Sequence, residues 1–382
     1  MAAEVVTVET AMADKSRVNS LTLIVSLLAA ALCAQAQTPP RVAPVPAHPL
    51  ELATAALTAA GTQPQRDAAL ELLSKARNRY ALRNVRQPWD LKVRFTVDSQ
   101  GRTNYDGEWQ MEDVFSPGQG LHWSARSSAG YAVSGIFAAD ETFMDATSNL
   151  VPLRLQEARA LLYNPIPSTT YAGSGSIRTL TTTFQNSPLT CVLLSQVRDS
   201  KPPAGRAWNE TEDCIDPGAG LLRIHSDAPG RYAVYDYTNG PRLGTHAIPR
   251  TVTVWEGGRV VSTVSVESLQ ALAAADPALF TPSDAMKAAG PAVSMTSATR
   301  ISRVHAAAPL PPGTTLRPLC VFGLLTPSGR LVEAHSLQPA DPNSDAAVKD
   351  AESIDFSPAL GASAAPQQRF VFIIESFPVE LQ

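Results

Sequence analysis

The chain has 382 residues, which is enough for two or three domains with sizeable apolar cores. Its formal charge of -4 at pH 7 argues against nucleic acid as a partner, because proteins that bind phosphate are usually basic. With 31 prolines, 22 glycines and only 6% aromatic residues, the composition favours strands and turns separated by polar loops.

The first 36 residues have the features of an export signal. Lys15 and Arg17 precede an apolar run over 21–33, and small residues follow at the positions that a signal peptidase reads. The run is shorter than the roughly 20 residues of a membrane span, which favours cleavage over anchoring. Residues 37–65 are Pro-rich at their start and are expected to form a tether. We therefore expect a protein of the periplasm or of the periplasmic face of the envelope.

Residues 66–270 are expected to form an antiparallel β domain. One face of a first helix carries apolar residues at helical spacing from Ala68 to Tyr80. Short alternating strands with tight turns follow over 89–137, a second helix covers 151–163, and strands resume over 176–270. Such a meander must curl or be covered in order to protect its edges.

The order helix, meander, helix, meander resembles the half-open barrel of the lipoprotein carrier LolA and the regulator domain RseB. The resemblance implies a concave sheet with lid helices that holds an apolar ligand such as an acyl chain. A strongly curved sheet can leave a cavity of ligand size. The large aromatic residues of the strands either line this cavity or fill a solid core, and both interpretations stay open. They are Phe95, Trp109, Trp123 and Phe137.

Two cysteines of the β domain are suited to pairing. Cys191 lies in an apolar strand and Cys214 in an acidic segment, and an oxidising periplasm would allow a disulfide between neighbouring strands. Such a disulfide would stabilise the fold by roughly 2–4 kcal/mol. The alternative is two free buried thiols. Cys320, further along the chain, is expected to be a small buried apolar residue.

The last part of the chain predicts a small ββαβ module after a linker. Residues 271–316 are rich in Ala, Ser, Thr and Pro and are expected to be the linker. The module, 317–382, begins with the strand LCVFGLL, the turn TPSG and the strand RLVEAHSL. A short helix starts near Asp345, and the β-prone run RFVFIIESF follows. The whole chain is therefore expected to be an α+β protein.

This order of elements resembles the C-terminal domain of TonB over residues 317–377. The resemblance rests on TPSGRLV at the turn, DAAVKDAESIDFSPAL at the helix and RFVFIIESF at the last strand. It implies that the edge of the last strand meets a segment of an outer-membrane transporter by strand addition. The alternative is that the linker or a second copy already covers this edge. The expected partner-binding residues are Phe370, Val371, Phe372, Ile373 and Ile374.

We predict no catalytic, cofactor or metal site. Asp341, Asn343, Asp345 and Glu352 have the spacing of calcium-loop ligands, but Ala346 stands where that loop needs glycine, and a helix start explains the residues better. The six histidines are never at zinc-ligand spacing. The chain has no nucleophile elbow and no phosphate-binding loop.

The sequence therefore predicts an exported, non-enzymatic envelope protein that engages a partner by strand addition. One alternative is a periplasmic carrier of lipid or lipoprotein, in which the C-terminal module is only a docking handle. Another is a hydrolase whose catalytic residues converge from distant positions. No cofactor and no nucleic-acid partner are expected.

Overall fold

The computed structural model describes ten stretches of the chain. Residues 1–46 and 47–382 are separate units, and every described residue belongs to the second. The predicted signal at 1–36 lies outside the described residues, as does most of the predicted tether. No helix of the described part is long and apolar enough to span a membrane. The described residues are 57–103, 105–138, 141–146, 151–166, 175–195, 206–290, 299–304, 311, 314–356 and 368–378.

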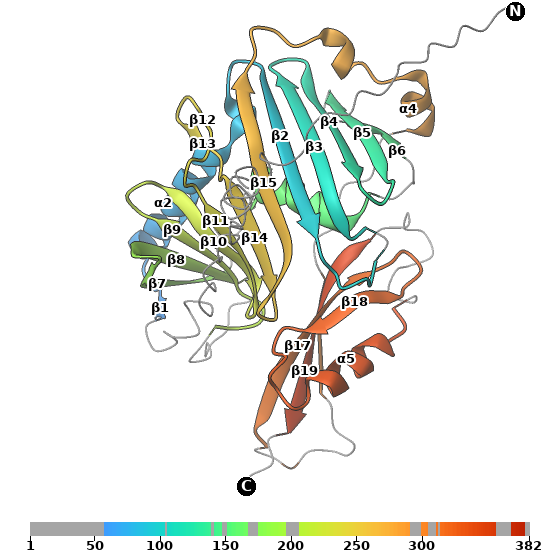
Figure 1. The fold of residues 1–382 in the computed structure, drawn as a ribbon. Coiled ribbons are helices and arrows are strands. Elements are labelled where there is room, and N and C mark those ends of the chain that lie inside the picture. Colours follow the sequence, from blue (N-terminus) through green and yellow to red (C-terminus); the bar gives the residue numbers. More distant parts are fainter. Residues whose placement is uncertain are drawn as a thin grey trace, which may run out of the picture. The chain divides into compact units, whose positions relative to one another are not determined.

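Thirteen strands form one open, antiparallel sheet (Figure 1). Their order along the sheet is β1-β7-β8-β9-β10-β11-β14-β15-β2-β3-β4-β5-β6. The predicted meanders before and after the second helix become the two halves of this sheet, and they join where β15 pairs with β2. The bounds are β1 (Thr58–Ala59), β2 (Trp89–Val97), β3 (Gly107–Ser116), β4 (Gly120–Ser127), β5 (Ala132–Ala138), β6 (Glu141–Ala146), β7 (Ser176–Phe184), β8 (Ser187–Ser195), β9 (Thr211–Asp216), β10 (Leu221–Ala228), β11 (Arg231–Asp236), β14 (Thr251–Glu256) and β15 (Arg259–Ala271).

The alternation of side chains gives this sheet an apolar inner face. In β2, Leu91, Val93 and Phe95 are buried, whereas Lys92 and Arg94 between them are exposed. This period of two is what a strand with one face on the core requires. The core is therefore continuous across the join between the two halves of the sheet.

The two predicted helices cover the inner face. Helix α2 (Gln63–Tyr80) starts with a capping box between Thr62 and Gln65 and packs on the half of the sheet that contains β7, β9 and β10 (Figure 1). Helix α3 (Leu153–Tyr163) is buried on several sides, so its contacts extend beyond the apolar stripe that the sequence shows. A short 3-10 helix, η2 (Leu82–Asn84), follows α2.

Smaller elements pack against the large sheet and its first helix. They are the two-stranded pair β12 (Arg242–Leu243) and β13 (His246–Ala247), the 3-10 helix η4 (Pro277–Phe280) and the helix α4 (Asp284–Ala289). Both η4 and α4 fall in the predicted linker, and they contact β4, β5 and β6.

The C-terminal sheet has four strands in the order β16-β19-β17-β18. The expected strand, turn, strand, helix and strand are all present. Helix α5 covers one face through Ala347 and Ala351, which pack with Val371 and Ile373 of the last strand. The bounds are β16 (Thr299–Val304), β17 (Leu316–Leu325), β18 (Leu331–Ser336), α5 (Ser344–Glu352) and β19 (Arg369–Pro378).

Strand β16 comes from the predicted linker and changes the interpretation of β19. It runs parallel to β19, with Ile301 opposite Ile373, while β17 pairs with the other edge of β19. The expectation of an open edge at β19 is therefore corrected, and the alternative in which the linker covers this edge describes the structure. The sequence TRISRV is short and half polar, so local sequence alone favours a linker over a strand here.

Candidate functional site

The four aromatic residues predicted around a cavity occupy two kinds of position. Phe95 and Trp109 are almost fully buried, and their rings stack with centroids 5.3 Å apart. Trp123 is also buried, whereas Phe137 is only half-buried and packs at the edge of the core. The first two are thus core residues, and Phe137 is the one that a ligand could reach.

Phe137 is one of the half-buried apolar side chains that pack against the core, and five of these are here called the rim. These residues pack against the core but keep part of their surface exposed. Trp89 connects the rim to the core, because its ring stacks on Phe115 at 5.4 Å and on Tyr163 at 6.2 Å. The rim consists of Phe115, Phe137, Met144, Val151 and Tyr163.

Two arginines lie among these aromatic rings. Arg159 of α3 donates from Nη2 to Asp113 Oδ2 at 3.2 Å, and its guanidinium carbon is 3.9 Å from the ring centroid of Trp123. Arg83 of η2 lies 5.2 Å from the ring centroid of Phe137 and is exposed. Cation–π contacts of this kind hold a guanidinium group without neutralising its charge.

A chain of buried ion pairs leads from the middle of the large sheet to α3. His225 Nδ1 lies 2.8 Å from Asp213 Oδ1, and its Nε2 lies 3.3 Å from Asp227 Oδ1. Arg231 donates to Asp227 and to Glu157 of α3. Each charge is thus compensated by the next one, as burial requires.

The chain of ion pairs continues into the C-terminal sheet through Arg154. Its guanidinium group donates to both oxygens of Glu256 at 2.8 and 3.0 Å and to Glu333 Oε2 at 2.9 Å. Nε2 of His335 lies 3.0 Å from Glu256 Oε2. Arg154 is 3% exposed and Glu256 is 1% exposed, so the two sheets meet through desolvated charges. We call Arg154, Glu157, Arg231, Glu256, Glu333 and His335 the junction.

The pKa values of the junction carboxyl groups differ because their partners differ. Burial raises the pKa of Glu333, and Arg154 only partly opposes this. Burial also acts to raise the pKa of Glu256, but Arg154, His335 and Arg231 together hold it well below the usual value. Glu256 is therefore the ionised centre of the junction.

The predicted partner-binding strand is a core strand of the C-terminal sheet. The five residues from Phe370 to Ile374 are all at most 9% exposed. Phe370 stacks on Phe322 at 5.2 Å, and both rings face the guanidinium groups of Arg154 and Arg231. These contacts use the predicted binding residues inside the chain.

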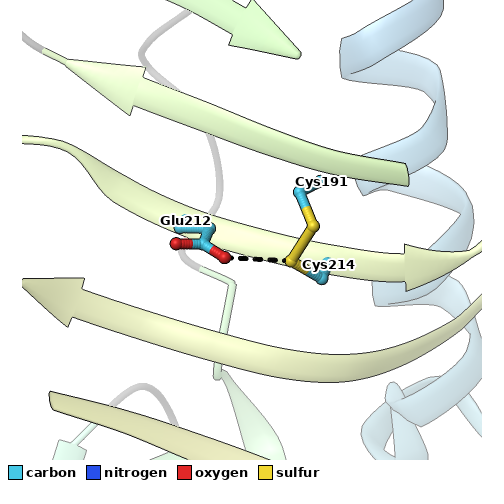
Figure 2. Close-up of side chains that lie close together, drawn as sticks. All are labelled: Cys191, Glu212 and Cys214. Atoms are coloured by element: carbon cyan, nitrogen blue, oxygen red, sulfur yellow. Dashed lines mark hydrogen bonds between the residues drawn. A yellow bond between two sulfur atoms is a disulfide. The ribbon is translucent and has the colours of Figure 1, made fainter. Parts of the chain in front are cut away.

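The predicted disulfide is present. Cys191 of β8 and Cys214 of β9 are directly opposite each other and are bonded (Figure 2). Oε1 of Glu212 lies 3.0 Å from Cys214 Sγ. Burial raises the pKa of Glu212 to about 8, so its carboxyl group can supply the proton that a disulfide sulfur lacks. Cys320 is a buried thiol outside the disulfide, as expected.

Two clusters of side chains that could serve as metal ligands make other contacts instead. Cys191, Glu212 and Cys214 are close enough together to hold an ion, but the disulfide removes both thiolates as ligands. Asp341 Oδ1, the first position of the calcium-like spacing, accepts from the backbone N–H of Asn343 and from Arg317. Helix α5 begins at Ser344, inside that spacing.

Two clefts of the described part are lined by a mixture of polar and apolar residues. One, of about 390 Å³, lies beside the junction, and the other, of about 470 Å³, lies on the outer face of β2 to β5. None of the four predicted aromatic residues lines either cleft. The junction cleft includes Arg102, Glu256, Arg259, His335, Lys349 and Glu352.

Sequence reasoning missed the junction. Arg154 and Glu157 are three residues apart on a predicted helix, and this spacing is also that of an ordinary surface ion pair. The signal in the sequence is that both charged residues stand among the apolar residues of the predicted helix, and the structure buries both of them.

No protein-family model and no curated protein matches the sequence. Among solved structures, a domain from Vibrio parahaemolyticus named for outer-membrane lipoprotein sorting has a TM-score of 0.36 and 10% identity, and covers 56% of this chain and 97% of that one. A LolA superfamily protein from Nitrosomonas europaea has a TM-score of 0.34 and 11% identity, and the match covers 56% of this chain and 97% of that one. A chain of the MucA/MucB complex of Pseudomonas aeruginosa has a TM-score of 0.22 and 12% identity, and the match covers 66% of this chain and 70% of that one. The predicted resemblance to TonB has no counterpart among these matches.

Proposed function

We propose that this protein is an envelope binding protein that carries an apolar ligand of the acyl-chain class at the rim. The observation that carries the proposal is the rim itself, where Phe137, Met144 and Tyr163 are half-buried against an apolar core. An acyl chain placed there would bury apolar surface at about 25 cal/mol per Å². Apolar concave surfaces with a few polar groups are typical of ligand sites.

An oxidising compartment suits this proposal. The Cys191–Cys214 disulfide is of the kind that persists outside the cytoplasm, and the N-terminal 36 residues have the pattern of an export signal. We propose the periplasm, or the periplasmic face of the envelope, as the location.

The C-terminal sheet is proposed to act together with the large sheet and not as a strand-adding handle. Support comes from the junction, where Arg154 joins Glu256 to Glu333. Further support is that both edges of β19 are paired. These contacts favour the carrier hypothesis over an outer-membrane transporter as partner.

We propose binding without catalysis. The buried carboxyl groups that could act as catalytic acids or bases are already paired inside the protein. Glu256, for example, pairs with two arginines. Glu212 is fully buried and held by Arg206, out of reach of a substrate.

The proposal is tested by displacement of dansyl-undecanoic acid with palmitate. Phe137→Asp places a charge on the rim and should weaken binding by about tenfold or more, the equivalent of 1.4 kcal/mol. Gln110→Asp is the matched control, because Gln110 is exposed on the outer face of β3. Circular dichroism checks that both variants are folded. Equal affinity of both variants and the wild type would remove the rim as the binding site.

A further inference from the structure

We propose that Arg83 and Arg159 form a subsite for the anionic head group of an acyl amphiphile, a carboxylate or a phosphate. The inference rests on the proposed function and adds a preference for charge to it. The subsite lies at the rim, where η2 and α3 approach the aromatic side chains of β4 and β5.

Arg83 carries the first part of the argument. Its guanidinium carbon lies 5.2 Å from the ring centroid of Phe137 and 5.9 Å from that of Tyr163. Within the described part of the chain, no carboxylate pairs with Arg83, and its side chain is exposed. A guanidinium group that two aromatic rings orient at an apolar surface is prepared for an anion, because it offers several donors in a fixed plane.

Arg159 extends the positive charge along the same rim. Its one ion pair in the described structure is with Asp113, which is fully buried. Partial burial lowers the pKa of Arg83, and the positive charge of Arg159 lowers it further. Two arginines with a single carboxylate leave one positive charge without compensation.

An unsatisfied polar atom marks the same place. Nε of Arg159 is buried and has no hydrogen-bond partner. Buried polar atoms without partners are uncommon and costly. A head group, with the water that it carries, would supply a partner to this donor.

The apolar neighbours determine what kind of anion fits. Phe137 and Tyr163 lie beside Arg83 and are half-buried, so a small hydrated anion would leave their rings partly exposed. An acyl chain attached to the anion would cover the rest of the rim. Inorganic phosphate alone is therefore expected to bind much more weakly than an amphiphile.

The test measures the affinity of the full-length protein for palmitate, phosphatidylglycerol, hexadecanol and inorganic phosphate. Each compound competes with a bound long-chain alcohol that carries a fluorescent dansyl group. The wild type should prefer palmitate or phosphatidylglycerol over hexadecanol by about tenfold, equivalent to 1.4 kcal/mol. Arg83→Gln should remove this preference and leave hexadecanol binding unchanged. Arg86→Gln, an exposed arginine three residues further on, should behave as the wild type.

Each outcome separates the two proposals. Binding of all three amphiphiles with equal affinity, unaltered in Arg83→Gln, would overturn the subsite and leave the proposed function intact. No binding of any amphiphile by the wild type would overturn both. A preference for palmitate over phosphatidylglycerol identifies a carboxylate, and the reverse identifies a phosphate. The double variant Asp113→Asn, Arg159→Gln removes the second cation without leaving a buried unpaired carboxylate, and should by itself weaken the anion preference of the wild type.

Discussion

Arg154 of α3 and Glu333 of β18 are 179 residues apart in sequence, yet Nη2 of the arginine donates to Oε2 of the glutamate at 2.9 Å. The same guanidinium group is bound to both oxygens of Glu256 at the end of β14. One cation therefore joins the large sheet, a helix on its inner face and the C-terminal sheet.

Replacement of Arg154 should be strongly destabilising. Arg154→Met would leave Glu256 and Glu333 buried without their main partner, and breaking a buried ion pair in this way costs about 3–5 kcal/mol. Arg94→Met is the matched control, because its pair with Glu267 has a similar 2.9 Å distance but is about half exposed. The control should cost less than about 1 kcal/mol. Urea unfolding measures both, and equal losses would contradict a special role for the junction.

Local structure could be predicted from local residues. The consecutive glycines Gly257 and Gly258, which are typical of a tight hairpin turn, join β14 to β15, and both have positive φ angles. The sequence does not reveal what this turn touches. A Cβ at Gly257 would come within 2.6 Å of Ser336 O, so the hairpin packs closely on the C-terminal sheet.

Contacts between distant segments could not be predicted. The sequence predicts an open edge at β19 because β16 is a short, half-polar segment inside a Pro- and Ala-rich stretch. In addition, parallel strands are not joined by a tight turn, so no local sequence signal indicates that β16 pairs with β19. The junction was missed because charged residues are almost never fully buried unless paired, and pairs such as Arg154 with Glu333 become visible only in three dimensions. The sequence predicts Phe137 and Trp123 as aromatic residues of the sheet, but it does not place the arginines Arg83 and Arg159 beside them.

Because His225 pairs with Asp213, the free energy of unfolding should fall as pH rises above neutral. Burial alone lowers the pKa of His225, but Asp213 and then Asp227 raise it from 6.5 to about 10. Below pH 6.5 both folded and unfolded states hold the proton, and the stabilisation is complete. Between pH 6.5 and 10 only the folded state holds it, so stability falls as pH rises, by up to about 1.4 kcal/mol per pH unit.

Variants at two histidines test this pH dependence. His225→Gln should flatten the fall in unfolding free energy between pH 8 and 9.5. His122→Gln is the control, since burial lowers the pKa of His122 and this histidine does not titrate in that window. Identical slopes in the wild type and His225→Gln would show that the histidine is neutral in the folded state.

Loss of the disulfide should destabilise the half of the sheet that contains β8 and β9. The double variant Cys191→Ala, Cys214→Ala is expected to lose about 2–4 kcal/mol of unfolding free energy. Dithiothreitol should lower the stability of the wild type but not that of the double variant. Unchanged stability of the wild type, with reduction verified by mass spectrometry, would contradict a stabilising bond.

Removal of β16 should expose the edge of β19 and cause self-association. Ile301→Pro introduces a residue without an N–H into the parallel ladder opposite Ile373, which is fully buried. The uncovered edge is apolar on both faces of the strand, and such edges pair with other chains. Light scattering should show a larger mass than that of the wild type, whereas Ser302→Ala, an exposed site on the same strand, should not change it. An unchanged mass for Ile301→Pro, with the amides of β19 still protected from hydrogen exchange, would show that β16 is not what covers this edge.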